Sequence, residues 1–296
     1  MNAPLDHQAL ERLLAGAEAL PSCPPVLAKV AEICSDPASS ARDLGAVIAT
    51  DEALTSRLIR LVNSAYYGLK GTISTVTQAV VVLGYVEIRN MVYAVRTGDL
   101  FAETSAPGGI DVLALWNHSL QVAVLARELS YRLRYPVPEE VFVAGVIHDL
   151  GQVILNQLLG AGYRKFREQA HADGVDLAAA EETAWGTSHA EVGRRLTARW
   201  DFPQSLQDAV AHHHRLPEGP GARDSAGLAR FVLAANCITL ERDRGRDARE
   251  ALAAVPGPVQ QELRLDLVRV EESLGRADEE YSRIRGTFDL SQGEEV

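Results

Sequence analysis

Apolar residues recur every three or four positions along most of this chain, which is the spacing of one buried face on an α-helix. After Asp51, for example, Leu54, Leu58 and Leu61 form such a face. Aspartate often caps a helix N-terminus, so we expect a helix to begin there. The same pattern predicts further short helices over 26–34, 40–49, 75–83 and 85–96.

The second half of the chain predicts longer helices, over 111–134, 138–159, 161–172, 176–199, 203–214 and 226–241. The most loop-like segment of the first half is 102–109, and we place a boundary between two lobes near residue 106. At the two ends, 7–20 predicts one more helix and 258–285 predicts an amphipathic helix whose apolar stripe could serve packing or dimerisation. We therefore predict an all-α fold.

Composition and charge narrow the classes of partner. Aromatic residues make up 6% of the sequence while hydrophobic residues make up 47%, which favours helices packed on helices. A net charge of -11 disfavours binding to nucleic acid or an anionic membrane surface, so a protein or small-molecule partner is expected. No apolar run approaches the roughly 20 residues that span a bilayer, and three cysteines without a CxxC pair fit a reducing cytoplasm.

Most of the eight histidines fall on the predicted long helices, at His118, His148, His189 and 212–214. A helical bundle can bring such side chains from several helices to one centre, where imidazole and carboxylate groups hold a divalent metal. His148 and Asp149 follow an apolar run that must be buried, so both need partners. The alternative is that Asp149 caps another helix or pairs with a histidine.

Several ordered motifs accompany these histidines. They are DEALT at 51–55, NSAYYG at 63–68, WNHS at 116–119, HAEVG at 189–193, WDFP at 200–203 and AVAHHH at 209–214. Together with the His148–Asp149 pair, this series resembles the HDOD family, whose members are relatives of the HD-type metal phosphohydrolases. The resemblance covers roughly residues 20–240.

The resemblance implies an N-terminal lobe, 21–106, packed on an HD-like lobe, 107–240, with a helix over 1–20 and a helical extension over 241–296. It also implies a divalent metal, which would be iron, manganese or zinc. The residues that match the superfamily's metal ligands are His118, His148, Asp149, His189, His213 and His214, with Asn236 at the position of an expected aspartate. Because 212–214 is a triplet, the register of the histidine pair is open by one residue.

Two departures from the hydrolase pattern bear on activity. Asn236 is neutral where an aspartate is expected, and Gln152 stands where relatives that hydrolyse cyclic dinucleotides have a phosphate-binding lysine. The resemblance then favours a non-catalytic or weakly metal-binding signal-transduction protein. Its partners would be signalling proteins, including those of cyclic-dinucleotide pathways, or further copies of this chain. The alternatives are a metal-dependent phosphohydrolase and a structural protein whose histidines fill polar core positions.

Three further groups of residues have simpler interpretations. Trp116 and Trp200 are expected to anchor the core, and the interleaved charges of 241–250 are expected to neutralise one another. The adjacent Glu181 and Glu182 could offer a general base, but a charged pair on a polar helix face is more often solvated. We therefore leave both glutamates out of the site.

Overall fold

The computed structural model describes residues 20–64, 67–69, 71–104, 106–218, 227–286 and 288. Within these residues every regular element is a helix, so the predicted all-α fold is confirmed. Trp116 and Trp200 are both buried in the core, as expected. Of the helix predicted over 7–20, residues 7–19 lie outside the described residues.

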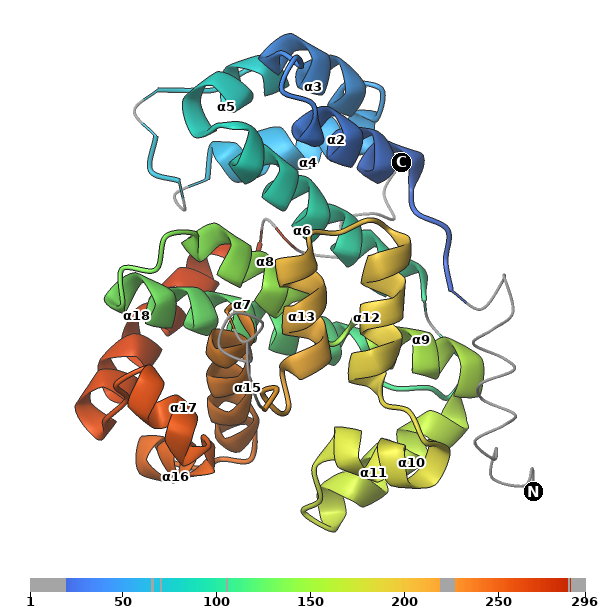
Figure 1. The fold of residues 1–296 in the computed structure, drawn as a ribbon, viewed down its shortest axis with the longest axis vertical. Coiled ribbons are helices and arrows are strands. Elements are labelled where there is room, and N and C mark those ends of the chain that lie inside the picture. The colour runs from blue at the N-terminus through green and yellow to red at the C-terminus, as the bar shows by residue number, and fades with distance from the viewer. Residues whose placement is uncertain are drawn as a thin grey trace.

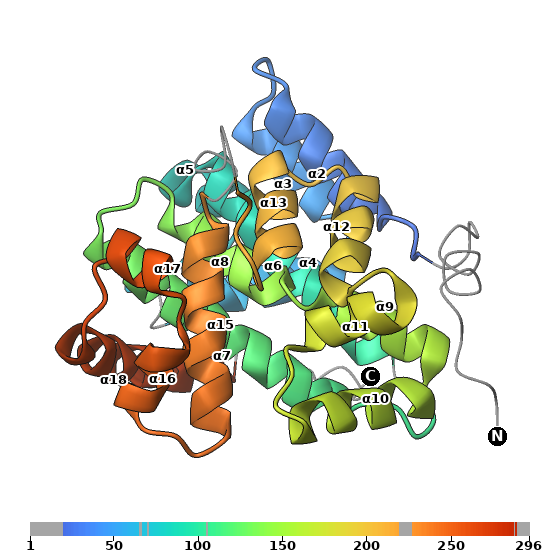
Figure 2. The same ribbon diagram turned by 60° about the horizontal axis from the view of Figure 1, so that its bottom comes forward.

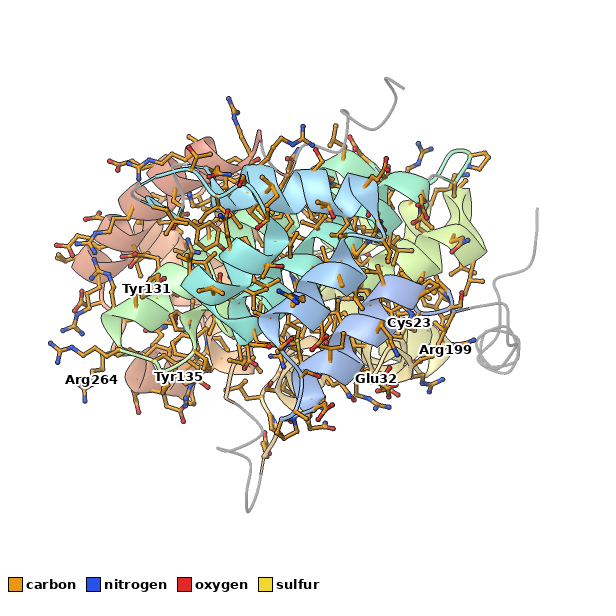
Figure 3. All side chains as sticks on the ribbon, turned by 90° about the horizontal axis from the view of Figure 1, so that it is seen from above. Cys23, Glu32, Tyr131, Tyr135, Arg199 and Arg264 are labelled. Carbon is orange, nitrogen blue, oxygen red and sulfur yellow. The ribbon has the colours of Figure 1, made fainter. Side chains whose placement is uncertain are left out.

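The first four helices of the described residues gather at one end of the molecule (Figure 1). They are α2 (Pro25–Ser35), α3 (Ala41–Ile48), α4 (Glu52–Val62) and α5 (Val76–Leu83). Asp51 caps α4 as predicted, because its side chain accepts a hydrogen bond from the backbone N–H of Leu54. Seen from above in Figure 3, these helices cover the middle of the remaining structure.

The next helix, α6 (Tyr85–Glu103), lies between this group and the rest of the chain (Figure 1). It packs against α2, α4 and α5 on one side and against α7 (Val112–Arg132) and α8 (Pro138–Ile147) on the other. The contacts of α6 on both of its sides do not test the predicted lobe boundary near residue 106, which stays a prediction. The loop between α6 and α7 does contain that residue.

The remaining helices of the described residues follow α8 along the chain. They are α9 (Leu150–Leu159), α10 (Ala161–Ala172), α11 (Leu177–Trp185), α12 (His189–Arg199), α13 (Gln204–His212), α15 (Ala229–Asp243), α16 (Ala248–Ala254), α17 (Gly257–Glu262) and α18 (Leu267–Ile284). The core helix α7 packs against α8, α15 and α18, while α12 packs between α9 and α13. Figure 2 shows α16 to α18 beside α15 and α7.

Two of the long helices predicted from the sequence are each broken in two. The segment 138–159 ends one helix at Ile147 and begins the next at Leu150, so that His148 and Asp149 form the turn between them. The segment 176–199 is interrupted after Trp185, where Gly186 takes a left-handed conformation with φ 70°. Apolar residues lie on both sides of each turn, so periodicity alone did not separate the helices, although Gly186 is of a residue type that often ends a helix.

The C-terminal segment packs within the chain. Instead of one helix over 258–285, α17 and α18 are separated by a turn in which Arg264 has a φ of 50°. The apolar face of α18, with Val270 and Leu274 buried, lies against α7. Among the charged residues of 241–250, Arg244 pairs with Glu241 and Arg246 with Glu250, as expected for local neutralisation.

One stretch of the described residues, Pro138–Leu159, is long and apolar enough to span a membrane by length and composition. Within this fold, however, 89% of its most apolar window is buried. It also contains the turn at His148 and Asp149. These are the properties of a helical stretch that supplies the core of a globular domain.

Close packing of α9 on α12 requires a glycine at position 151. A Cβ atom there would lie 1.8 Å from the carbonyl oxygen of His189. We expect Gly151→Ala to lower the free energy of unfolding by about 3 kcal/mol, because the backbones must separate. Urea unfolding would measure this, with Gly162→Ala as the control: a Cβ at Gly162 meets nothing within 4 Å. An equal loss in both variants would contradict the packing argument.

Candidate metal centre

Four helix ends and the middle of two helices meet at one buried centre. His148 and Asp149 form the turn between α8 and α9, and His189 is the first residue of α12. His213 and His214 directly follow α13. The last two predicted site residues project from within helices: His118 from α7 and Asn236 from α15.

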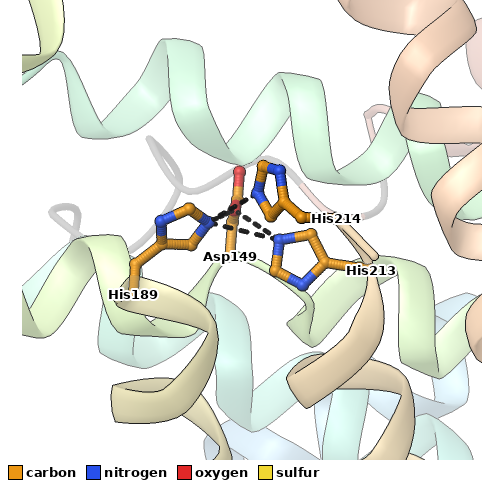
Figure 4. Close-up of side chains that lie close together, drawn as sticks. All are labelled: Asp149, His189, His213 and His214. Atoms are coloured by element: carbon orange, nitrogen blue, oxygen red, sulfur yellow. Dashed lines mark hydrogen bonds and ion pairs between the residues drawn. The ribbon is translucent and has the colours of Figure 1, made fainter. Parts of the chain in front are cut away.

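Asp149 lies in the middle of this centre (Figure 4). Its carboxylate oxygens are 3.3 Å from Nε2 of His148, 3.3 Å from Nε2 of His189 and 3.6 Å from Nε2 of His213. Although Asp149 occupies the N-cap position of α9, its side chain makes no capping hydrogen bond. Burial would raise the pKa of this carboxyl, but attraction to His148 and its other histidine neighbours holds the pKa well below its usual range. Asp149 therefore does not cap α9, and its carboxylate lies among histidines instead.

Two of the histidines are oriented by backbone carbonyl groups. Nδ1 of His148 lies 2.7 Å from the carbonyl oxygen of Gly145, and Nδ1 of His213 lies 2.7 Å from that of Val210. A carbonyl oxygen can only accept a hydrogen bond, so Nδ1 carries the proton in each ring. Nε2 of each ring then faces Asp149.

The other three histidines are oriented by carboxylates. Nδ1 of His189 lies 2.7 Å from Glu181, and Nδ1 of His214 lies 2.6 Å from Asp176. Nδ1 of His118 lies 3.3 Å from an oxygen of Asp243. Carboxylates in this position fix the tautomer and ring orientation of metal-ligating histidines and increase their basicity. All five rings therefore have Nδ1 engaged and Nε2 facing inward.

The inward-facing nitrogens crowd one another. Nε2 of His189 is 3.2 Å from Nε2 of His213 and 2.9 Å from Nε2 of His214. Two lone pairs at such distances repel unless a cation lies between them or one ring carries an additional proton. Among the described residues, the buried Nε2 of His148 and Oδ1 of Asp149 have no hydrogen-bond partner. These unsatisfied acceptors fit a bound metal ion.

The potential ligands form two groups that share Asp149. One comprises Asp149, His189, His213 and His214; the other comprises His118, His148 and Asp149. Within each group the ligand atoms all lie within 4.8 Å of one another. The six predicted residues are thus brought together, and His213 and His214 supply the pair from the 212–214 triplet. That these residues bind metal stays a prediction.

His189 is one group of the metal-free centre whose pKa is shifted. Burial alone would lower its pKa, but Glu181 foremost, together with Asp149, raises the pKa to about 10. The folded-state pKa thus exceeds the ordinary value of about 6.5. The added proton stabilises the metal-free fold fully below about pH 6.5, and this contribution is lost as the pH rises through about 10.

A metal ion must displace the proton of His189. We therefore expect metal binding near neutral pH to release protons, and affinity to fall as the solution becomes more acidic. Calorimetric titrations in two buffers of different ionisation enthalpy would measure this release. Identical binding enthalpies in the two buffers would contradict it.

Glu181 corrects an expectation from the sequence. Instead of lying in solvent, it is fully buried and accepts hydrogen bonds from the Tyr163 hydroxyl and the His189 backbone N–H, at 2.7 and 2.6 Å. Together with its contact to Nδ1 of His189, these bonds make it a positioning residue for the centre. Glu182, in contrast, is exposed as expected.

The two residues that depart from the hydrolase pattern both face the centre. Oδ1 of Asn236 lies 3.0 Å from Nε2 of His118, so an amide oxygen can serve as a neutral ligand beside that imidazole. Gln152 is 4% exposed, and its Oε1 has no hydrogen-bond partner in the described chain. Both residues line a cavity of about 280 Å³ that also reaches His118 and Asp149.

A sequence model of the HDOD domain matches residues 20–216. The chain therefore belongs to the HDOD family, as the motifs predicted. A curated relative, an uncharacterized protein of Treponema pallidum (strain Nichols), is 25% identical over 202 residues, which are 68% of this chain and 39% of that protein. The chain thus spans well under half the length of this relative.

Solved structures share the fold over nearly its whole length. An HDOD domain protein of unknown function from Geobacter sulfurreducens is 26% identical, with a TM-score of 0.73 and coverage of 95% of this chain and 96% of that one. A candidate phosphohydrolase from Shewanella amazonensis SB2B is 24% identical, with a TM-score of 0.72 and coverage of 93% of this chain and 97% of that one. A candidate signal transduction protein from Marinobacter aquaeolei VT8 is 18% identical, with a TM-score of 0.68 and coverage of 98% of this chain and 68% of that one.

Proposed function

We propose that this chain is a regulatory HDOD protein whose His/Asp centre holds a divalent metal and which acts through contacts with signalling proteins. The observation that carries the metal site is the convergence of five imidazole Nε2 atoms on the buried carboxylate of Asp149. Imidazole nitrogen with carboxylate oxygen suits iron, manganese or zinc better than magnesium or calcium. When bound, such an ion would supply positive charge that could polarise an oxygen ligand.

Two neutral side chains favour regulation over hydrolysis. Asn236 and Gln152 both line the cavity, and neither brings the charge that the hydrolase pattern has at its position. Asn236 weakens electrostatic attraction for the metal, and Gln152 removes a cation that would meet a phosphate. In this function the chain's own residues hold the ion and thereby tie α7, α8, α12, α13 and α15 together. The metal then stabilises a signalling scaffold.

A phosphohydrolase is the second candidate, and the cavity that reaches Asp149 favours it. The discriminating measurement is turnover of bis-nitrophenyl phosphate, cyclic dinucleotides or nucleotides by metal-loaded protein. The regulatory proposal predicts no turnover above that of the metal alone. Turnover that disappears in Asp149→Ala would overturn the regulatory proposal in favour of the enzyme.

The partner contacts can be tested on the N-terminal helices. Val81 and Val82 on α5 are among the most exposed large apolar residues, at 73% and 53%. If the chain acts through these helices, affinity capture with the double variant Val81→Ser, Val82→Ser should lose specific protein partners that the wild type recovers. Recovery of the same partners by both baits would count against this part of the proposal.

A further inference from the structure

The cavity beside the metal centre has a charge pattern of its own. Its acidic wall residues all have basic partners: Asp149 lies among histidines, Asp176 binds His214, and Glu241 pairs with Arg244. Asp176 and Glu241 therefore each contact a basic side chain, and Asp149 is shared by both groups of potential metal ligands. The basic residues of the wall are not all paired in this way.

Arg167 on α10 is the exception. It is half-buried and lines the cavity, yet it takes part in no hydrogen bond or ion pair among the described residues. A half-buried guanidinium group gives up part of its hydration, and without a partner that loss is uncompensated. The cavity thus contains one guanidinium group without a hydrogen-bond or ion-pair partner among the described residues.

A second polar group in the wall also lacks a partner. Gln152 is more than nine-tenths buried, and its side chain makes no hydrogen bond within the described chain. The buried atom without a partner is the acceptor Oε1, and the same amide carries Nε2–H groups that can donate to an oxygen atom entering the cavity. Arg167, Gln152 and the metal centre then border one space of about 280 Å³, a volume suited to a small metabolite.

The rest of the wall defines the other end of a ligand. Val175, Leu177 and Leu240 line the same cavity and offer apolar surface. His171 and Arg244 are in mutual contact at 3.3 Å and lie in the same wall. A ligand that satisfies every part of the cavity needs an anionic group for Arg167 and an apolar part for these side chains.

We propose that this cavity binds a small organic oxyanion, a phosphoryl or carboxylate group on an apolar body, with Arg167 as its main recognition residue and Gln152 as a second donor. A guanidinium group matches both kinds of oxyanion, because its planar N–H groups can donate two parallel hydrogen bonds. The inference deepens the proposed function, since it gives the regulatory metal site a small-molecule ligand. The inference rests on the proposed function only where the bound metal would contact the ligand, and recognition by Arg167 does not depend on it.

Calorimetric titration of the manganese-loaded protein with phenylphosphonate and with benzoate tests this site. The two probes share an aromatic ring, and the phosphonate resists hydrolysis. We expect Arg167→Gln to weaken binding of the preferred probe about 10- to 100-fold, as for loss of a charged hydrogen bond. Arg164→Gln is the matched control: Arg164 lies one turn away on α10, pairs with Glu168, and does not line this cavity. Its affinity should equal that of the wild type.

The outcomes separate this inference from the proposed function. Preferential binding of phenylphosphonate assigns the site to phosphoryl groups, whereas preferential binding of benzoate assigns it to carboxylates. Equal affinity of Arg167→Gln and the wild type, or no binding of either probe at millimolar concentration, would overturn the inference. Elemental analysis of each sample reports the metal independently. If the chain retains no metal, the proposed function fails, and the same titration of metal-free protein still decides the role of Arg167.

Discussion

Replacing Asp149 with alanine is expected to abolish metal binding, with affinity reduced by more than about 100-fold, beyond the loss typical of residues that only orient ligands. The physical reason is that Asp149 belongs to both groups of potential ligands and is the one carboxylate they share. Its removal would also leave the nitrogens of His148, His189 and His213 facing one another without a compensating charge. Metal affinity would be measured by competition with a chelator of known affinity.

The matched control is Asp173→Ala. Asp173 follows α10, is exposed, and accepts a hydrogen bond from Gln169 rather than from a histidine. It removes the same charge from the chain without touching the centre, so metal affinity should stay at the wild-type value. Retention of metal by Asp149→Ala, in a protein whose circular dichroism shows it to be folded, would mean that the histidines bind metal without this carboxylate.

Replacing Glu181 with alanine is expected to lower the free energy of unfolding by about 3–5 kcal/mol, as when one partner of a buried ion pair is removed. The change would leave the Tyr163 hydroxyl and two N–H groups of His189 buried without their acceptor. Metal affinity should also fall about 10- to 100-fold, because His189 would lose the group that orients its ring. Denaturant unfolding and chelator competition measure the two effects separately.

Glu182→Ala is the control for this variant. Glu182 is the next residue of α11 and is exposed, so its replacement should change stability by no more than about 0.5 kcal/mol. Conservative replacement by Glu181→Gln should recover part of the stability but less of the metal affinity, since the amide keeps an acceptor and loses the charge. If Glu181→Ala bound metal as tightly as the wild type, the positioning role of Glu181 would be wrong.

Much of the fold follows from the spacing of apolar residues. That spacing locates most helices to within a few residues, for example α4 after its cap at Asp51. It does not locate the turn at 148–149, because the segments on either side of that turn are both buried, nor the turn at Gly186, which lies between two helices that each have a buried face. Burial continues through a turn when the chain runs through the core, so the apolar pattern continues as well. These turns place Asp149 and His189 at helix ends, where their side chains can meet.

The candidate site was predictable in its inner residues and less so in its supporting ones. The motifs pointed to the histidines and Asp149, which do converge. They did not point to Asp176, Glu181 and Asp243, the carboxylates that contact Nδ1 of three of these histidines. For Glu181 a signal was present, because it lies three residues after Ala178 and four before Trp185, both buried. That spacing puts it on the apolar face of α11. For Asp176 and Asp243 the contacts depend on tertiary structure, and no local pattern reveals them.

The central claim is that the His/Asp centre binds a divalent metal. The most direct measurement is elemental analysis of the purified chain after incubation with manganese, iron or zinc and removal of free metal. The proposal predicts bound metal in amounts approaching stoichiometric for the wild type, and its loss in His148→Ala, which removes an Nε2 that is buried and without a hydrogen-bond partner. Wild-type protein that retains none of the three metals would contradict it.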